Sequence, residues 1–201
     1  MNQPLRVVDR PNSRFDSIDT RDVHEADALG FMPRPLVITT LPHRRPESHR
    51  FARVNGRHRL RLSAPRRVGL PYGSYARLLL AYLTTEAVRT KSPQIDLGAT
   101  PNGLARKLGL SVISGARGTA RRLENQLHRL LHMRLEWQTS MGPAARTSGS
   151  AYVTAGGAPL LQLLRRQLPG RTIWRSQIVL SQSCFEEITR SAVPLDLRAM
   201  R

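Results

Sequence analysis

The segment SGARGTARRLENQLHRLLHMRLEW, residues 114–137, constrains the fold most strongly because it combines a helical apolar stripe with an almost acid-free polar side. Apolar residues recur along it at spacings of three or four, which predicts a helix that begins between Gly115 and Thr119. Its core-facing positions would be Ala120, Leu123, Leu127, Leu130 and Leu131. The rest of the chain must therefore supply an apolar surface that covers this stripe and leaves the other side exposed.

The other side of this predicted helix is basic. Its residues are Arg122, Asn125, Arg129 and His132, flanked by Arg121 and His128. A helix that is only solvated usually mixes charges of both signs one turn apart, whereas Glu124 is the only acid between Ser114 and Met133. We weigh an ordinary solvated face against contact with a polyanion, and we favour the polyanion.

The charge of the whole chain agrees with such a partner. Its 201 residues contain 32 Lys and Arg against 14 Asp and Glu, a formal net charge of +18, and most of the excess is arginine, whose planar fork suits phosphate. No apolar run is long enough to cross a bilayer and the start MNQPLRVVDR lacks a signal-peptide core, so we expect a cytoplasmic protein without a membrane partner. Cys184 is the only cysteine, which excludes an internal disulfide and a cysteine-rich zinc site.

The N-terminal third predicts an arm followed by strands. Residues 1–34 show no helical or strand periodicity and predict a mobile arm. Residues 35–68 predict a strand at PLVITTLP and a β-hairpin that turns at Asn55-Gly56. In that hairpin Leu60 and Leu62 would face the core, and Arg59 and Arg61 would face solvent.

Residues 69–201 predict a winged-helix domain, so the fold class expected for the chain is α+β. SYARLLLAYLTTEAVR predicts a core helix capped by Ser74, SPQIDLG a short strand, and TPNGLARKLGL a helix with Thr100 at its N-cap. The basic helix follows, and then RLEWQ and TIWRSQIVLS predict two paired strands joined by a long basic wing loop, 139–172. PLLQLLRRQL predicts a short helix within that loop, and CFEEITR a final helix with Ser183 and Glu186 as a capping box.

This order of elements is that of a winged helix, whose third helix enters the major groove of DNA. The connection GLSVISGARG is longer than the usual helix-turn-helix turn of about three or four residues. For base edges we predict Arg121, Arg122, Asn125, Arg129 and His132. For phosphates we predict Arg106, Lys107, Arg117 and Thr119, together with backbone N–H groups of GARGT. For the wing we predict Arg146, Arg171 and Arg175.

Several stretches together resemble one known family. They are LPH at 41–43, GLPYGSYARLLLAYLTTEAVRTKSPQIDLG at 69–98, LARKLGL at 104–110, SGARGTARRLENQLHRLL, and IVLSQSCFEEITRSAVPLDLRAM. From Leu36 to Arg198 their order resembles the RepA-type plasmid replication initiators, which are winged-helix proteins that bind origins. The resemblance implies binding to repeated sites in double-stranded plasmid origin DNA, melting of nearby DNA, and recruitment of the host initiator and the replicative helicase.

The same resemblance implies that members continue past PLDLRAM into further helices, so we expect this chain to be incomplete at its C-terminus relative to the family. A homodimer is a further partner that the sequence leaves open. The runner-up function is a DNA-binding transcriptional regulator, or an interaction module that pairs with a full-length initiator.

Enzymatic functions find little support, and we expect neither catalysis nor a cofactor. His128 and His132 have the four-residue spacing of zinc ligands, but Arg129 occupies the place where the metalloprotease pattern needs Glu. A rolling-circle initiator would need a tyrosine beside a His-apolar-His cluster, which the sequence lacks. No GxxxxGK[ST] loop for ATP is present either.

Overall fold

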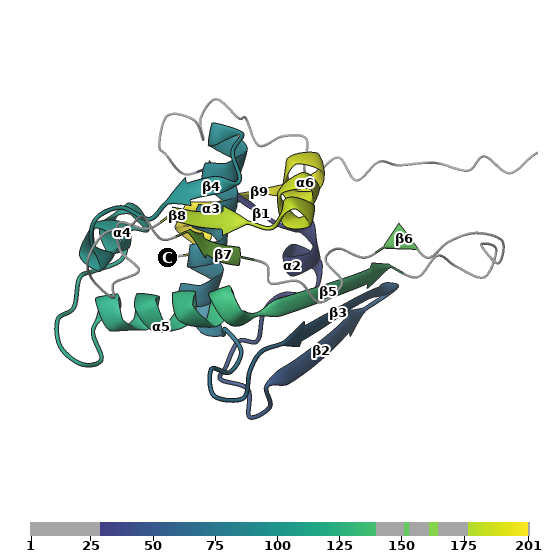
Figure 1. Ribbon diagram of the computed structural model, residues 1–201, viewed down its shortest axis with the longest axis horizontal. Coiled ribbons are helices and arrows are strands. Elements are labelled where there is room, and N and C mark those ends of the chain that lie inside the picture. The colour runs from purple at the N-terminus through teal and green to yellow at the C-terminus, as the bar shows by residue number, and fades with distance from the viewer. Residues whose placement is uncertain (1–28, 140–150, 153–160, 165–176, 201) are drawn as a thin grey trace, which may run out of the picture.

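The computed structural model describes residues 29–139, 151–152, 161–164 and 177–200. Helices and strands are mixed along these residues, which confirms the α+β class (Figure 1). The described strands form three antiparallel sheets, with the orders β1-β9, β2-β3-β5-β6 and β4-β8-β7. Residues 1–28 of the predicted arm and the predicted wing residues Arg146, Arg171 and Arg175 lie outside the described residues.

The hairpin at Asn55-Gly56 forms as predicted. Strands β2 (Arg50–Asn55) and β3 (His58–Ser63) pair around a turn in which Gly56 has a φ of 54°, a conformation that glycine adopts without strain. Leu60 and Leu62 are buried in the core, and Arg59 and Arg61 are exposed.

Two predictions about the N-terminal region are wrong. The stretch at Pro35 forms a short helix, α2 (Arg34–Ile38), where we predicted a strand. Pro35 lies in the first turn, where a helix does not use its N–H, and Thr39 donates its hydroxyl proton to the Pro35 carbonyl at 2.7 Å. The predicted arm over 1–34 also extends too far, because β1 (Leu29–Met32) pairs with β9 (Val193–Asp196).

The basic segment forms one of three helices that follow one another in the chain. Their bounds are α3 (Gly73–Thr90), α4 (Pro101–Lys107) and α5 (Thr119–His132). Thr100 caps α4 as predicted, because its Oγ1 accepts a hydrogen bond from the Gly103 N–H at 3.1 Å. Ser74 does not cap α3, since that helix begins one residue earlier and Tyr72 is at its N-cap. The start of α5 at Thr119 lies within the predicted interval.

The two strands predicted to pair as a wing belong to different sheets. Strand β5 (Arg134–Thr139) pairs with β3, and β6 (Ala151–Tyr152) pairs with β5. Strand β8 (Gln177–Leu180) pairs instead with β4 (Gln94–Asp96) and with β7 (Leu161–Leu164). The predicted helix PLLQLLRRQL is therefore wrong over β7, because pairing with β8 at the edge of a sheet overrides a local apolar pattern that fits either structure.

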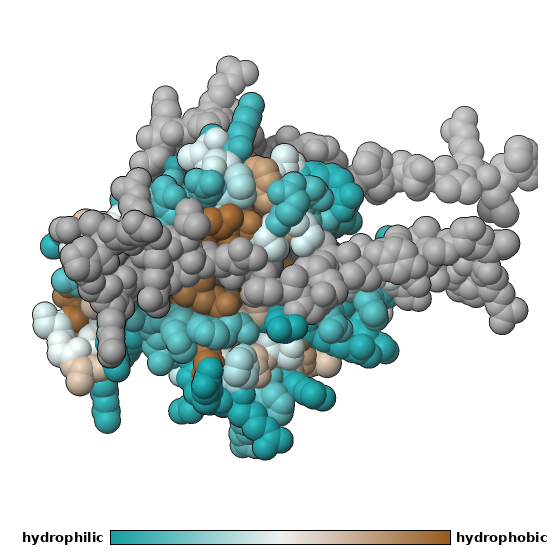
Figure 2. All heavy atoms as spheres, in the orientation of Figure 1, coloured by the Kyte–Doolittle hydropathy of each residue, from teal (hydrophilic) through white to brown (hydrophobic). Residues whose placement is uncertain are grey.

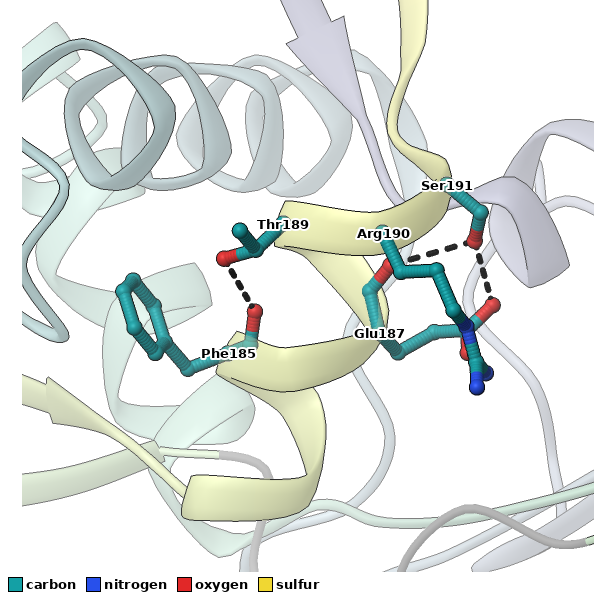
Figure 3. A network of polar contacts seen from close by, with 5 residues as sticks. All are labelled: Phe185, Glu187, Thr189, Arg190 and Ser191. Carbon is teal, nitrogen blue, oxygen red and sulfur yellow. Dashed lines mark hydrogen bonds and ion pairs between the residues drawn. The ribbon is translucent and has the colours of Figure 1, made fainter.

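The last helix, α6 (Gln182–Ser191), begins before the predicted capping box. Ser183 lies inside the helix, and Glu186 accepts a hydrogen bond from the Gln182 side chain at 2.8 Å. The C-terminal end of α6 is held by its own side chains, because Ser191 Oγ is hydrogen-bonded to the carbonyl and the carboxylate of Glu187 (Figure 3). Glu187 also forms an ion pair with Arg190. A 3₁₀ turn, η2 (Leu197–Met200), follows β9.

One hydrophobic core joins residues from all three sheets and the helices. Leu123, Leu127 and Leu130 of α5 are each 0% exposed, which confirms the predicted apolar stripe at these positions, and Ala120 and Leu131 are half-buried. Helix α5 is therefore fixed to the core by one side.

Candidate nucleic-acid interface

Helix α5 presents its predicted basic side to solvent. In Figure 1 the helix runs along the lower left of the molecule, and the lower edge of the same strip is hydrophilic in Figure 2. The exposed side chains are Arg121, Arg122, Asn125, His128 and His132. The structure therefore brings the sequence-predicted residues of this helix onto one accessible surface.

Part of this surface is hollowed into an open groove of about 710 Å³, which we call the α5 groove. Three segments line it: residues 43–45, the first turn of α3 with the residue before it, and α5. The lining residues are His43, Arg44, Arg45, Tyr72, Gly73, Ser74, Tyr75, Arg122, Asn125, Gln126 and Arg129. No Asp or Glu is among the described residues that line it, so the field of the arginines is not neutralised locally.

Arg129 is more a part of the groove's framework than a free reader of bases. Its Nη1 donates to the Leu70 carbonyl at 3.1 Å, its Nε donates to Asn125 Oδ1 at 2.8 Å, and its guanidinium lies 5.5 Å from the Tyr72 ring. Gly69 permits this approach, because a Cβ there would lie 2.6 Å from Nη1. Burial lowers the pKa of Arg129, and Arg45 lowers it too, while Tyr72 acts in the opposite direction.

The other exposed residues of α5 have different surroundings. The guanidinium of Arg122 lies 5.8 Å from the Tyr75 ring, within cation–π range, and still lines the groove. Arg121 is 75% exposed and faces Glu124 at 3.9 Å. His132 packs its ring against His128, and burial followed by the charges of His132 and Arg129 lowers the pKa of His128.

The predicted phosphate contacts are not gathered at this groove. Arg106 and Lys107 of α4 are exposed, but they line a second pocket of about 420 Å³ together with Glu86 and Arg89 of α3. Arg117 is exposed in the loop before α5. Three of the four predicted contacts are thus accessible, two of them at the second pocket and one in the loop before α5.

Thr119 is the fourth and is a correction, since it is 1% exposed. Its hydroxyl donates to the Ser111 carbonyl at 2.6 Å and accepts from the Ile113 N–H at 3.1 Å, which fastens the loop from Ser111 to Gly118. The backbone N–H groups of Gly118 and Thr119 are bonded to the carbonyls of Gly115 and Ile113, so they do not point at a phosphate as predicted for GARGT.

A comparison with models of protein families identifies the family of this chain. The model of the plasmid encoded RepA protein family matches residues 70–201, more than half of the chain. The chain belongs to this family. A RepA-family protein has a role in plasmid replication. Searches of curated proteins and of solved structures found no match.

The matched region contains α3, α4, α5 and α6, and therefore most of the α5 groove, whereas residues 43–45 precede it. Sequence reasoning missed the groove's non-helical contributors. Arg44 and Arg45 are adjacent cations, which was the available signal, but only the folded chain shows that they lie beside α5. Tyr72 and Gln126 gave no signal of their own.

Among the described residues, no three His, Cys, Asp or Glu side chains are grouped closely enough to hold a metal ion. In the same part of the chain, no helix is both long and apolar enough to span a membrane.

Proposed function

We propose that this protein binds double-stranded DNA at a plasmid origin in a sequence-specific manner to initiate replication, with α5 in the major groove. The observation that carries the proposal is the basic side of α5, on which Glu124 is the single acid, with Arg122 and Asn125 at the α5 groove. Arginine and asparagine are the residue types that pair in bidentate fashion with guanine and adenine edges. Membership of the RepA family supplies the plasmid context.

The topology supports a winged-helix arrangement. Along the chain α3, β4, α4 and α5 are followed by β5 and β6, which join another sheet, and then by β7 and β8, and β8 lies between β4 and β7 in their sheet. In such an arrangement the third helix, here α5, is the one that enters the major groove. The hairpin of β7 and β8 is then the wing, and Arg171 and Arg175 fall in the sequence between these strands.

Arg129 has a supporting role in this proposal. Because its Nε holds the Asn125 side chain through Oδ1, it fixes the orientation of the amide that would meet an adenine. Arg122 keeps its guanidinium at the groove without a hydrogen bond to a neighbouring side chain among the described residues, so it is the first candidate for a guanine contact.

The test first selects a binding site from a pool of random duplexes. The affinity of the protein and of its variants is then measured for the selected duplex and for a random duplex. Arg122→Ala should weaken binding to the selected site by about 1–3 kcal/mol and binding to the random duplex by much less. If about six phosphates are neutralised, the slope of log affinity against log salt for the unchanged protein should be about −5. Arg190→Ala on α6 is the matched control, since it removes one exposed arginine from another helix.

A folded Arg122→Ala protein with unchanged affinity and sequence preference would count against α5 as the reading helix. The place of the selected sequence in the plasmid separates the proposed initiator from a transcriptional regulator, because an initiator's sites recur at the origin and a repressor's overlap a promoter. Recruitment of a host initiator and a replicative helicase belongs to the same proposal and rests on the family resemblance alone.

A further inference from the structure

The α5 groove is held open by contacts between its three walls. Gln126 Oε1 accepts a hydrogen bond from the Tyr72 N–H at 3.0 Å, which joins α5 to the start of α3. The Gly73 N–H donates to the Pro42 carbonyl at 3.0 Å, and Arg77 Nη1 lies 3.0 Å from His43 Nδ1, which joins α3 to the segment before Arg44. Residues far apart in the sequence are thus fixed around one hollow.

Inside this groove the hydrogen-bonding groups favour an anion. Gln126 is 6% exposed, its oxygen is used by Tyr72, and its amide nitrogen has no acceptor among the described residues. A buried donor without an acceptor costs free energy, and a ligand oxygen would remove that cost. Arg44 and Arg45 are exposed beside it, and three arginines, Arg44, Arg45 and Arg129, therefore line the same hollow. The pKa of Arg129 is lowered mainly by burial and to a smaller extent by Arg45.

The position of the groove indicates which anion. A helix that lies in the major groove, about 12 Å wide, has a phosphate strand on either side of it. Residues 43–45 line the α5 groove opposite α5, so the sugar-phosphate strand beside the helix would pass close to these residues. Contacts of this kind hold the protein in register and carry no sequence information.

We propose that the α5 groove is a site for a backbone phosphate of DNA, held by Arg44 and Arg45 at its rim and by the Gln126 amide at its floor. The proposal rests on the proposed function, since the phosphate belongs to the duplex that α5 reads. It places residues 43–45, which precede the family-matched region, in the DNA interface.

The test compares Arg44→Ala/Arg45→Ala with Arg57→Ala/Arg59→Ala. The second pair removes the same charge from the β2-β3 turn, which the register places beside Thr139, at the end of β5 far from α5. Affinity for a selected and a random duplex is measured from about 50 to about 300 mM salt. The groove variant should weaken both duplexes by the same factor and make the salt slope less steep by about one for each arginine, whereas the control should change the slope by less.

A groove variant whose slope equals that of the unchanged protein would overturn this inference. If Arg122→Ala still alters sequence preference in that case, α5 keeps its proposed function and only the phosphate site fails. If Arg122→Ala has no effect either, the proposed function fails as well.

Two further measurements identify the source of the phosphate and the part played by Gln126. Inorganic phosphate and ATP are titrated by calorimetry into the unchanged protein and into the groove variant. The proposal would be overturned in favour of a free phosphate compound if the groove variant lost binding of either compound while its salt slope for DNA stayed unchanged. Gln126→Glu keeps an oxygen for the Tyr72 N–H and places an anion at the floor. It should weaken both duplexes at least as much as loss of one arginine, and a folded variant with unchanged affinity would contradict the assignment of Gln126.

Discussion

Helices α4 and α5 both place cations beside a hollow in the surface, but the surroundings of the two sets differ. The pocket at α4 includes Glu86, which faces the same space as Arg106 and Lys107, whereas the described lining of the α5 groove contains no carboxylate. The difference comes from helix α3, whose C-terminal half contributes Glu86 to the pocket at α4 and whose first turn contributes Tyr75 to the α5 groove. Basic composition alone therefore does not mark an interface, because a neighbouring acid partly neutralises the cations within the protein.

The largest expected effect tests whether loss of DNA binding at α5 is separable from loss of fold. Leu127→Ala removes a side chain that is 0% exposed and should lower the free energy of unfolding by about 2–5 kcal/mol. Urea unfolding measures this, and Val54→Ala, at a position 61% exposed, should stay within about 0.5 kcal/mol. A Leu127→Ala protein as stable as the unchanged one would mean that α5 is not fixed to the core as described.

A smaller effect concerns how the two helices begin. Thr100→Ala removes the side-chain cap of α4 and should cost about 1 kcal/mol in the free energy of unfolding. Helix α5 has Gly118 at its N-cap and no side-chain cap, and a Cβ at Gly118 would lie 2.2 Å from the Ile113 carbonyl oxygen. Gly118→Ser should therefore destabilise the protein although serine is a good cap residue. A stabilised Gly118→Ser variant would show that the loop before α5 yields easily.

The smallest effect is a pH dependence to which α5 contributes and α4 does not, since α4 contains no histidine. Burial, with His132 and Arg129, holds the pKa of His128 below 6.5, so the unfolded chain binds this proton more readily than the folded one. Stability contributed by neutral His128 is present above pH 6.5 and is lost as the pH falls below that value. The free energy of unfolding, measured at about pH 7.5 and about pH 5.5, should fall less between these pH values for His128→Gln than for the unchanged protein. An equal fall in both proteins would assign the pH dependence to other groups.

What the sequence predicted correctly was encoded locally. Thr100 caps the helix that follows it, Asn55-Gly56 turns the hairpin beside it, and the leucines of α5 recur at helical spacing. Some errors were also local, such as the strand predicted at α2 and the cap predicted at Ser74. The errors of topology concern strand pairing: β5 joins β3, and β7 joins β8, because burial and hydrogen bonding along a sheet outweigh local preference.

The candidate site divides in the same way. The accessible side of α5 was predictable from its periodicity, and so were Arg122 and Asn125 as exposed residues. The place of Arg44 and Arg45 beside that helix depends on contacts such as that of the Gly73 N–H with the Pro42 carbonyl, which no spacing in the sequence records.

The pairing of β1 with β9 has a consequence for synthesis on the ribosome. Strand β1 ends at Met32 and its partner begins at Val193, so at about 5–20 residues per second the first strand waits on the order of ten to thirty seconds for the second. Helix α3 emerges during this interval and can bind the first strand, because the Phe31 N–H donates to Thr85 Oγ1 at 2.8 Å. The nascent chain can thus shelter its first strand on a helix until the closing strand leaves the exit tunnel.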